Sequence, residues 1–282
     1  MVIPRGAPAH VAKVLQDAGV IRRPLLFRAA ALATRAQGPL HAAELAFPAH
    51  ASLAEVFAVL RTARPVAHDL TIPEGLTAAG IARLIDRAPA LVGDIDLPPE
   101  GAVLPQTYAF TRGTARDALL RRAEAAMQAA LARVWAGRDP GLPLDSPEQL
   151  LTLASLIERE TARPAERAHV AAVFVNRLRN GMRLQSDPTV AYAATGGEVT
   201  GGRDLTRDDL DAPNPYNTYR VAGLPPGPID SPGLASLQAA AHPEHSDDLY
   251  FVADGSGGHV FARTLAEHDR NVARWRAGEA MR

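Results

Sequence analysis

A degenerate repeat in the first third of the chain limits its fold more than any other sequence feature. An Ile-Pro-x-Gly run leads into an apolar segment of helical period twice, at residues 3–15 and 72–85, and a weaker copy occupies residues 47–60. Each copy predicts a short strand, a turn and an amphipathic helix, with Thr77 and Ser52 as helix N-caps. The pattern fits a sugar-binding module of LysM type and a ligand-free βα packing unit equally well.

Bulk properties narrow the class of protein. The chain has 282 residues, 47% hydrophobic and 22% charged, which is typical of a packed soluble fold of one or two domains. A net charge of -1 indicates no nucleic-acid partner, and the absence of cysteine excludes thiolate catalysis and disulfides. No stretch reaches the ~18 apolar residues of a membrane-spanning helix, and no signal peptide opens the chain. A missing upstream segment and a complete protein are equally compatible with this start.

The rest of the chain predicts an α+β fold in two parts, with a boundary near residue 105. We expect residues 1–105 to form the LysM-like βα-repeat region and residues 106–282 to form a mostly helical domain. Ser146 and Pro147 are typical of a helix start. Residues 182–233 lack regular periodicity and predict a loop-rich cleft. The further elements expected are helices over residues 116–135, 150–161, 170–178 and 264–275, and a β-hairpin over residues 249–262.

Two glutamates near the end of the predicted helix 150–161 are the first candidates for chemistry. Glu158 and Glu160 flank the apolar face on opposite edges. A carboxyl beside a core, at a helix C-terminus, has its charged form disfavoured, so its pKa rises toward the range that suits a general acid. The plainer alternative is that both are solvated and pair with Arg163 or Arg167.

The loop-rich stretch and the histidines complete the candidates. Residues 184–189 and 214–219 bring together amides, hydroxyls and tyrosines, which suits a sugar polymer, although turn chemistry produces the same composition. His242 and His245 lack the helical spacing of a zinc motif, so we expect no metal and no cofactor. The glycine-rich turn at residues 254–258 lies between two predicted strands, which argues against a phosphate-binding loop.

Six blocks between residues 150 and 262 carry a family resemblance. In order along the chain they are residues 153–161, 173–178, 181–190, 216–219, 223–229 and 249–259. They closely resemble the endolytic murein transglycosylases, the MltG or YceG-like family. The N-terminal third resembles the LysM-like region of that family more loosely, because Ala43, Glu44 and Leu45 stand where the family shows a Gly-x-Tyr strand.

The resemblance implies an enzyme of the cell wall. It implies cleavage of the β-1,4 bond between N-acetylmuramic acid and N-acetylglucosamine within peptidoglycan strands, leaving 1,6-anhydromuramyl ends. It also implies a location on the periplasmic face of the bacterial inner membrane, an anchor upstream of Met1, and cell-wall synthases of the elongation or division machinery as partners.

The family's catalytic glutamate matches Glu160. Protonated, it would donate to the glycosidic oxygen. As a carboxylate it would then accept the proton of the muramic acid C6 hydroxyl that attacks the anomeric carbon. This route needs no water and no second carboxylate. The substrate-binding residues expected around it are Gln185, Asp187, Tyr216, Asn217 and Tyr219, with Glu158 in a supporting role.

Two alternatives stay open at this point. One is a peptidoglycan-binding scaffold without activity, which the intact block around Glu160 disfavours. The other is a water-using glycoside hydrolase with Asp187 as its second carboxylate.

Overall fold

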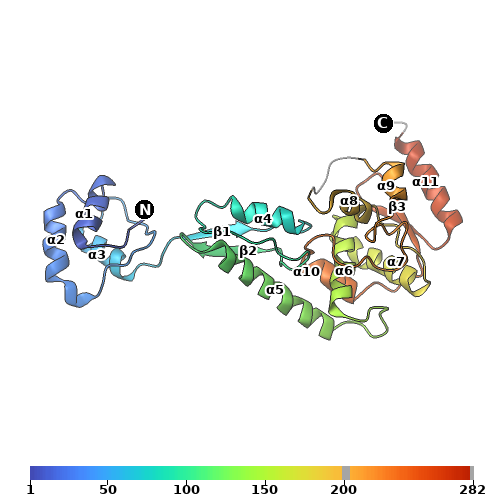
Figure 1. Ribbon diagram of the computed structural model, residues 1–282, viewed down its shortest axis with the longest axis horizontal. Coiled ribbons are helices and arrows are strands. Elements are labelled where there is room, and N and C mark those ends of the chain that lie inside the picture. The colour runs from blue at the N-terminus through green and yellow to red at the C-terminus, as the bar shows by residue number, and fades with distance from the viewer. Residues whose placement is uncertain (199–203, 280–282) are drawn as a thin grey trace. The chain divides into compact units, whose positions relative to one another are not determined.

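The structure, a computed structural model, describes residues 1–198 and 204–279 and is a mixture of helices and small sheets (Figure 1). It contains two compact units. The first consists of Met1–Leu70, Pro89–Val92 and Ala109–Ala115, and the second of Thr71–Ala88, Gly93–Tyr108 and the remainder from Arg116. The α+β class predicted from the sequence is confirmed.

The first unit is a small helical body. Its helices are α1 (Pro8–Asp17), α2 (Pro24–Ala33), the 3-10 turn η1 (Arg35–Gln37) and α3 (Leu53–Thr62), and it also includes most of a small sheet. Phe27 and Phe57 stack in its core, with ring centroids 4.7 Å apart. The N-cap predicted at Ser52 is confirmed, because its hydroxyl accepts from the Glu55 amide.

The strands predicted for two of the three repeat copies are wrong. Val2 makes only an isolated bridge with Glu44, and residues 47–52 form no strand. In the described part of the chain, only two backbone amide hydrogen bonds, from Ile3 to Ala43 and from Leu45 to Met1, join the first copy to a neighbouring segment, which is too short a ladder for a strand. α2, between the first and the weaker copy, was not predicted.

The middle copy has the predicted form. β1 (Ala67–Thr71) pairs with β2 (Thr107–Thr111) in a two-stranded sheet, and a turn leads from β1 into α4 (Ala78–Asp86). The Thr77 hydroxyl caps α4 by accepting from the Gly80 amide at 3.3 Å.

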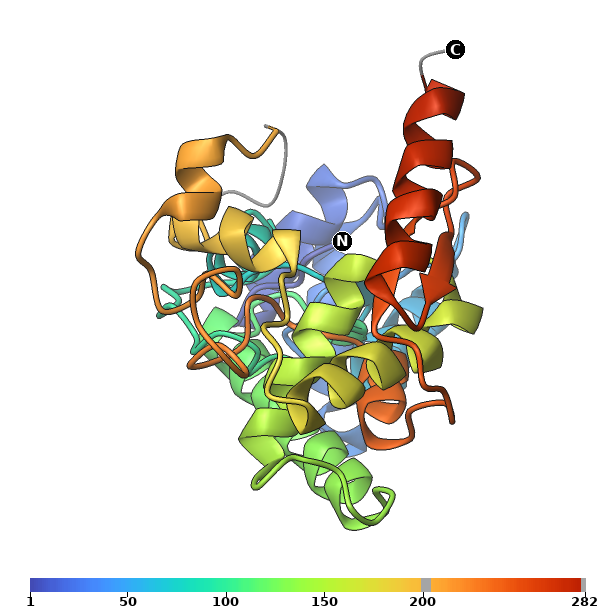
Figure 2. The ribbon, with the colours of Figure 1, turned by 90° about the vertical axis from the view of Figure 1, so that its right-hand side faces the viewer.

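The second unit is built around one buried helix, α6 (Pro147–Glu160). Ser146 caps it as predicted, and every residue from Leu150 to Ile157 is buried. Figure 2 shows α6 crossing α7 (Arg167–Arg179), and α10 (Leu234–Ala241) packs against both. The long α5 (Arg116–Ala136) follows its predicted limits and contacts α6.

Within the described residues, the remaining strands and α-helices of the second unit are a hairpin and three helices. β3 (Tyr250–Ala253) and β4 (His259–Ala262) form the predicted antiparallel hairpin, with Phe251 opposite Phe261. α11 (Leu265–Glu279) follows it. The stretch predicted to be loop-rich contains two helices as well, α8 (Asp187–Thr195) and α9 (Arg207–Asp211), while its residues 199–203 lie outside the described part of the chain.

Candidate active site

Glu160 is the last residue of α6, so the packing of that helix determines where its carboxyl lies. The chain leaves the helix at Thr161, whose backbone is extended, and continues into the 3-10 turn η2 (Pro164–Glu166). Because every residue from Leu150 to Ile157 is buried, the end of α6 cannot shift without disturbing the core.

A single hydrogen bond connects Glu160 with the segment before α8. The Ser186 hydroxyl donates to Glu160 Oε1 at 2.5 Å. Ser186 is itself buried, and its amide donates to the Thr218 hydroxyl at 2.9 Å. Gln185, just before it, has a left-handed backbone with φ of 51°, which costs a non-glycine residue free energy. The loop therefore holds Ser186 in one orientation toward Glu160.

The surroundings raise the pKa of Glu160 to about 7. Burial against protein atoms is the largest cause, although the residue keeps part of its surface open to solvent. The hydrogen bond from Ser186 opposes the rise, the negative charge of Asp187 adds to it, and the positive charges of Arg177 and Arg159 oppose it. A group with this pKa exchanges its proton readily at neutral pH, which is what alternating acid and base roles require.

Arg177 brings a buried positive charge to the same region. Its guanidinium donates to the carbonyl oxygens of Leu249 at 2.6 Å and Leu184 at 2.8 Å. It also lies over the Tyr250 ring, 5.2 Å from the centroid. These contacts hold the loop before Ser186 against the β3–β4 hairpin, and the charge favours the ionised form of Glu160.

Asp187 and Tyr219 form a pair beside Ser186. The Tyr219 hydroxyl donates to Asp187 Oδ1 at 2.6 Å, and burial followed by the Asp187 contact raises the pKa of Tyr219. Asp187 and Gln185 are both exposed. Gln185 and Asp187 flank Ser186 in the chain, and Tyr219 bonds to Asp187. Polar groups of three predicted site residues therefore lie close to the Glu160 carboxyl.

Tyr216 belongs to a neighbouring aromatic cluster. Its ring lies 4.8 Å from that of Tyr192, whose hydroxyl donates to Glu100 at 3.3 Å. Burial raises the pKa of Glu100, which also accepts from the Ala78 amide.

Asn217 and Glu158 use their side chains for internal contacts. The buried Asn217 amide donates to three carbonyl oxygens around the end of α9 and accepts from the Tyr219 amide. Glu158 accepts from Arg167 at 3.3 Å and from the Gly233 amide at 2.9 Å. The pairing of a helix-end glutamate with Arg167 thus holds for Glu158, whose side chain is only 6% exposed and therefore not solvated. Both side chains fix the course of loops near the site.

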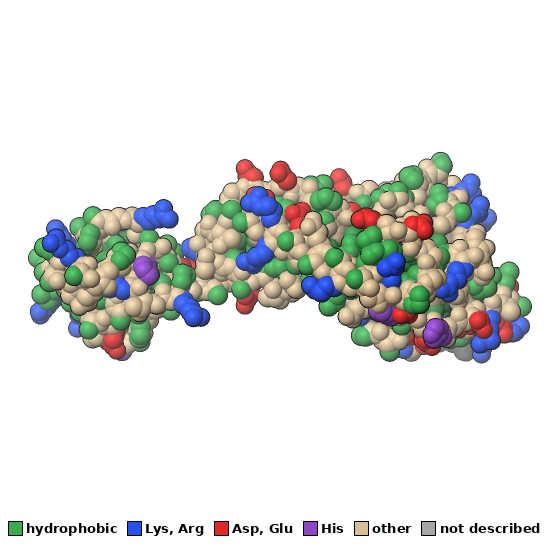
Figure 3. All heavy atoms as spheres, turned by 90° about the horizontal axis from the view of Figure 1, so that it is seen from below, with side chains coloured by type: hydrophobic (Ala, Val, Ile, Leu, Met, Phe, Trp, Pro, Cys, Tyr) green, Lys and Arg blue, Asp and Glu red, His purple; other side chains and the backbone are tan. Residues whose placement is uncertain are grey.

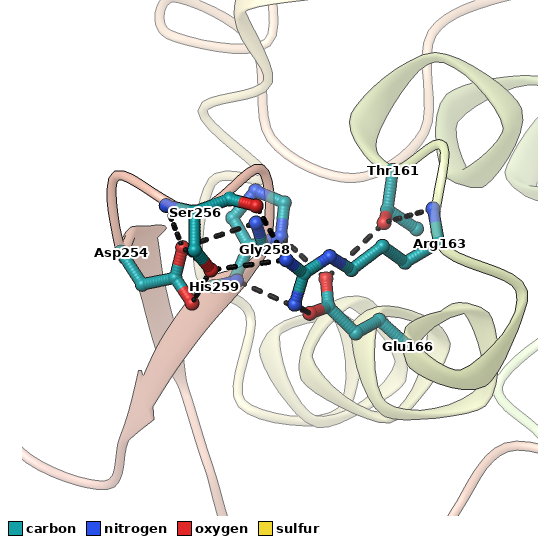
Figure 4. Close-up of polar contacts among 7 residues, drawn as sticks. All are labelled: Thr161, Arg163, Glu166, Asp254, Ser256, Gly258 and His259. Atoms are coloured by element: carbon teal, nitrogen blue, oxygen red, sulfur yellow. Dashed lines mark hydrogen bonds and ion pairs between the residues drawn. The ribbon is translucent and has the colours of Figure 1, made fainter.

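A polar network joins the segment after α6 to the β3–β4 turn (Figure 4). The Arg163 guanidinium donates to the Ser256 carbonyl at 2.5 Å and hydroxyl at 2.9 Å. The Glu166 carboxylate accepts from the His259 backbone amide, and its Oε2 lies 2.8 Å from His259 Nδ1. The Thr161 hydroxyl donates to the same Glu166 carboxylate at 3.2 Å. The residue directly after Glu160 is therefore anchored to the hairpin.

Sequence reasoning did not select Ser186 or Arg177 as site residues. Both stand in blocks that carry the family resemblance, but a serine between exposed residues and an arginine in a helix carry no distinctive pattern. Only the folded chain brings them to Glu160.

The described residues contain no group of three or more His, Asp or Glu side chains arranged to hold a metal ion. His242 instead pairs with Asp139 at 2.7 Å. None of the described helices combines the length and apolar character needed to cross a bilayer.

A half-buried acid at the end of α6, surrounded by polar loop residues, defines a candidate acid–base catalytic site. The profile of the YceG-like family matches residues 1–274, and the chain belongs to that family. A crystal structure of a yceG-like protein from Listeria monocytogenes superimposes with a TM-score of 0.59 at 30% identity, covering 95% of this chain and 97% of that one.

Two curated relatives have a stated activity. The endolytic murein transglycosylase of Bacillus subtilis (strain 168) is 48% identical over 128 residues, which are 44% of this chain and 34% of that protein. The protein of the same name from Streptococcus pneumoniae serotype 2 (strain D39 / NCTC 7466) is 38% identical over 179 residues, 62% of this chain and 32% of that protein. The chain spans about a third of the length of these relatives.

Proposed function

We propose that this chain is an endolytic peptidoglycan lytic transglycosylase, and that Glu160 is its acid and base. The observation that carries the proposal is the environment of Glu160, a helix-end carboxyl with a pKa of about 7 and a single hydrogen bond from Ser186. The names of the two curated relatives agree with it.

The reaction follows from one group changing its protonation state. Protonated Glu160 donates to the oxygen between N-acetylmuramic acid and N-acetylglucosamine as the glycosidic bond breaks. The resulting carboxylate accepts the proton of the C6 hydroxyl, whose oxygen bonds to the anomeric carbon and closes the 1,6-anhydro ring. The proton count balances, and no water enters. Ser186 steadies the carboxylate through Oε1 and leaves Oε2 to meet the substrate.

The substrate-binding roles follow the exposure of the side chains. We assign direct glycan contacts to Gln185, Asp187, Tyr216 and Tyr219, whose side chains are exposed or partly exposed. Asn217 and Glu158 act by holding loops in place, because their polar atoms are already occupied within the protein.

The wider setting is proposed on the same basis. Peptidoglycan strands lie in the periplasm, so the site would act there, trimming or terminating strands beside cell-wall synthases. The division at residue 105 would separate a LysM-like glycan-binding region from the catalytic region. The helix-capped strand–turn–helix of residues 67–86 supports a LysM-like unit there.

Product analysis tests the proposal. Protein incubated with purified sacculi should release fragments that end in 1,6-anhydromuramic acid, each lighter by one water than a hydrolysis product. Reducing ends alone would indicate a hydrolase and would make Asp187 the second carboxylate. No release at all, from a folded protein, would support the non-catalytic scaffold.

A further inference from the structure

The outer face of α2 is apolar and has no partner within the described residues. Leu25, Leu26 and Leu32 are 74%, 51% and 67% exposed. Phe27 and Ala31 on the opposite side are buried in the core of the first unit. At 100° per residue, Leu25 and Leu32 lie about 20° apart around the helix axis, and Ala29 lies on the same face one turn after Leu25. α2 therefore presents a continuous apolar stripe about two turns long to solvent.

Arginines border this stripe. Arg22 and Arg23 stand just before the helix, Arg28 lies beside Leu25 and Leu32 on the wheel, and all three are exposed. Arg22, Arg23 and Leu26 also line a hollow together with Phe47 and His50. In Figure 3, basic and hydrophobic side chains lie side by side at the edge of the first unit where α2 runs.

The charge of the whole chain is unevenly divided. The first unit contains nine Lys and Arg against four Asp and Glu, a net charge of +5. The remaining residues contain 21 Lys and Arg against 27 Asp and Glu, a net charge of -6. The unit that exposes the apolar stripe is thus also the basic unit. A large exposed apolar surface on a soluble protein marks an interaction site.

We propose that the α2 face of the first unit docks on an anionic lipid bilayer. An apolar helix face with arginines at its border lies in the interfacial region of a membrane, where leucines enter the acyl boundary and guanidiniums meet lipid phosphates. Each Arg near such a surface strengthens binding by an amount that depends on salt. The docking is independent of the catalytic proposal, because it involves no residue of the Glu160 site.

Vesicle sedimentation with the full chain tests the docking. The protein should bind large vesicles of equimolar phosphatidylglycerol and phosphatidylcholine, bind pure phosphatidylcholine weakly, and dissociate as salt is added. Leu25→Ser with Leu32→Ser, and Arg22→Gln with Arg23→Gln and Arg28→Gln, should each lower the partition coefficient by at least about tenfold. Matched controls alter exposed residues elsewhere: Leu97→Ser with Leu265→Ser, and Arg87→Gln with Arg133→Gln and Arg276→Gln.

A second measurement does not depend on variants that remove the stripe. Because the chain has no cysteine, Leu25→Cys and Leu97→Cys each provide one site for an environment-sensitive fluorophore. The label at residue 25 should shift to the blue on anionic vesicles, and the label at residue 97 should not.

Three results would overturn the proposal. The first is equal binding by the α2 variants and their controls, and the second is equal binding to neutral and anionic vesicles. The third is an oligomer that the α2 variants dissociate in the absence of lipid, because the stripe would then cover a second copy of the chain.

Discussion

The two glutamates at the end of α6 have the same side chain and opposite surroundings. Glu158 accepts from Arg167 and from the Gly233 amide, so its charge is balanced by a cation and a backbone donor. Glu160 has one neutral donor, Ser186, and a negative neighbour, Asp187, and its pKa rises to about 7. Two residues along a helix thus separate a carboxylate that joins elements from a carboxyl that can exchange a proton. What surrounds the group decides its role.

The largest expected effect comes from exchanging each glutamate for its neutral amide. Glu160→Gln should keep the fold and lower cutting of sacculi by at least the ~10²-fold typical of losing a general acid. Glu158→Gln should keep measurable turnover. It should destabilise the fold by roughly 1–3 kcal/mol and not more, because Glu74 still pairs with Arg167 at 3.5 Å. Melting curves and turnover on the same preparations measure both. A well-folded Glu158→Gln that is inactive beside a normal Glu160→Gln would reverse the assignment.

The two loop neighbours of Glu160 should move its pKa in opposite directions. Ser186→Ala removes the hydrogen bond that lowers this pKa, so the alkaline limb of the pH–rate profile should move to higher pH. Asp187→Asn removes the charge that raises it, so the limb should move to lower pH. Each shift should be about one pH unit or less, a size that profiles of kcat/KM resolve.

Conservative variants distinguish this tuning from simple damage. Ser186→Thr retains the hydroxyl and should keep the profile of the unaltered protein. Shifts of the same sign for Ser186→Ala and Asp187→Asn would show that the site responds to loop disorder and not to electrostatics.

How much of this site was predictable depends on the residue. The limits of α5, the caps at Ser146 and Thr77, and the hairpin came from local patterns that the structure confirms. Helical period alone could not separate Glu158 from Glu160, because both flank the same apolar stripe, and the family resemblance made that choice. α2 escaped prediction because apolar residues occupy its exposed side as well as its buried side, which removes the usual period.

Long-range contacts account for most of what was missed. Ser186 meets Glu160 across 26 positions of sequence, and its orientation depends on the left-handed backbone of Gln185, which no local pattern announces. Asp230 is a further case, a buried carboxyl that the sequence places in an ordinary proline-rich loop.

A further stability effect concerns Asp230, near Glu158. Both of its carboxyl oxygens are buried without a hydrogen-bond partner, and burial, then repulsion by Glu158, raises its pKa well above the usual value. A raised folded-state pKa stabilises the fold below the unfolded pKa, and that contribution is lost as pH rises toward the folded value. Asp230→Asn should therefore stabilise the fold by roughly 1–3 kcal/mol, and more at pH 8 than at pH 5. Denaturant melts at both pH values measure this, and an equal change at the two values would mean that Asp230 does not titrate between them.

Direct titration of Glu160 tests the account most sharply. With ¹³C in the glutamate side-chain carboxyl carbons, the NMR resonance that disappears in Glu160→Gln identifies this group. It should titrate near pH 7, and its midpoint should rise in Ser186→Ala. A midpoint below pH 5 in the unaltered protein would contradict the account, because Glu160 would then be ionised at neutral pH and could not serve as the proton donor.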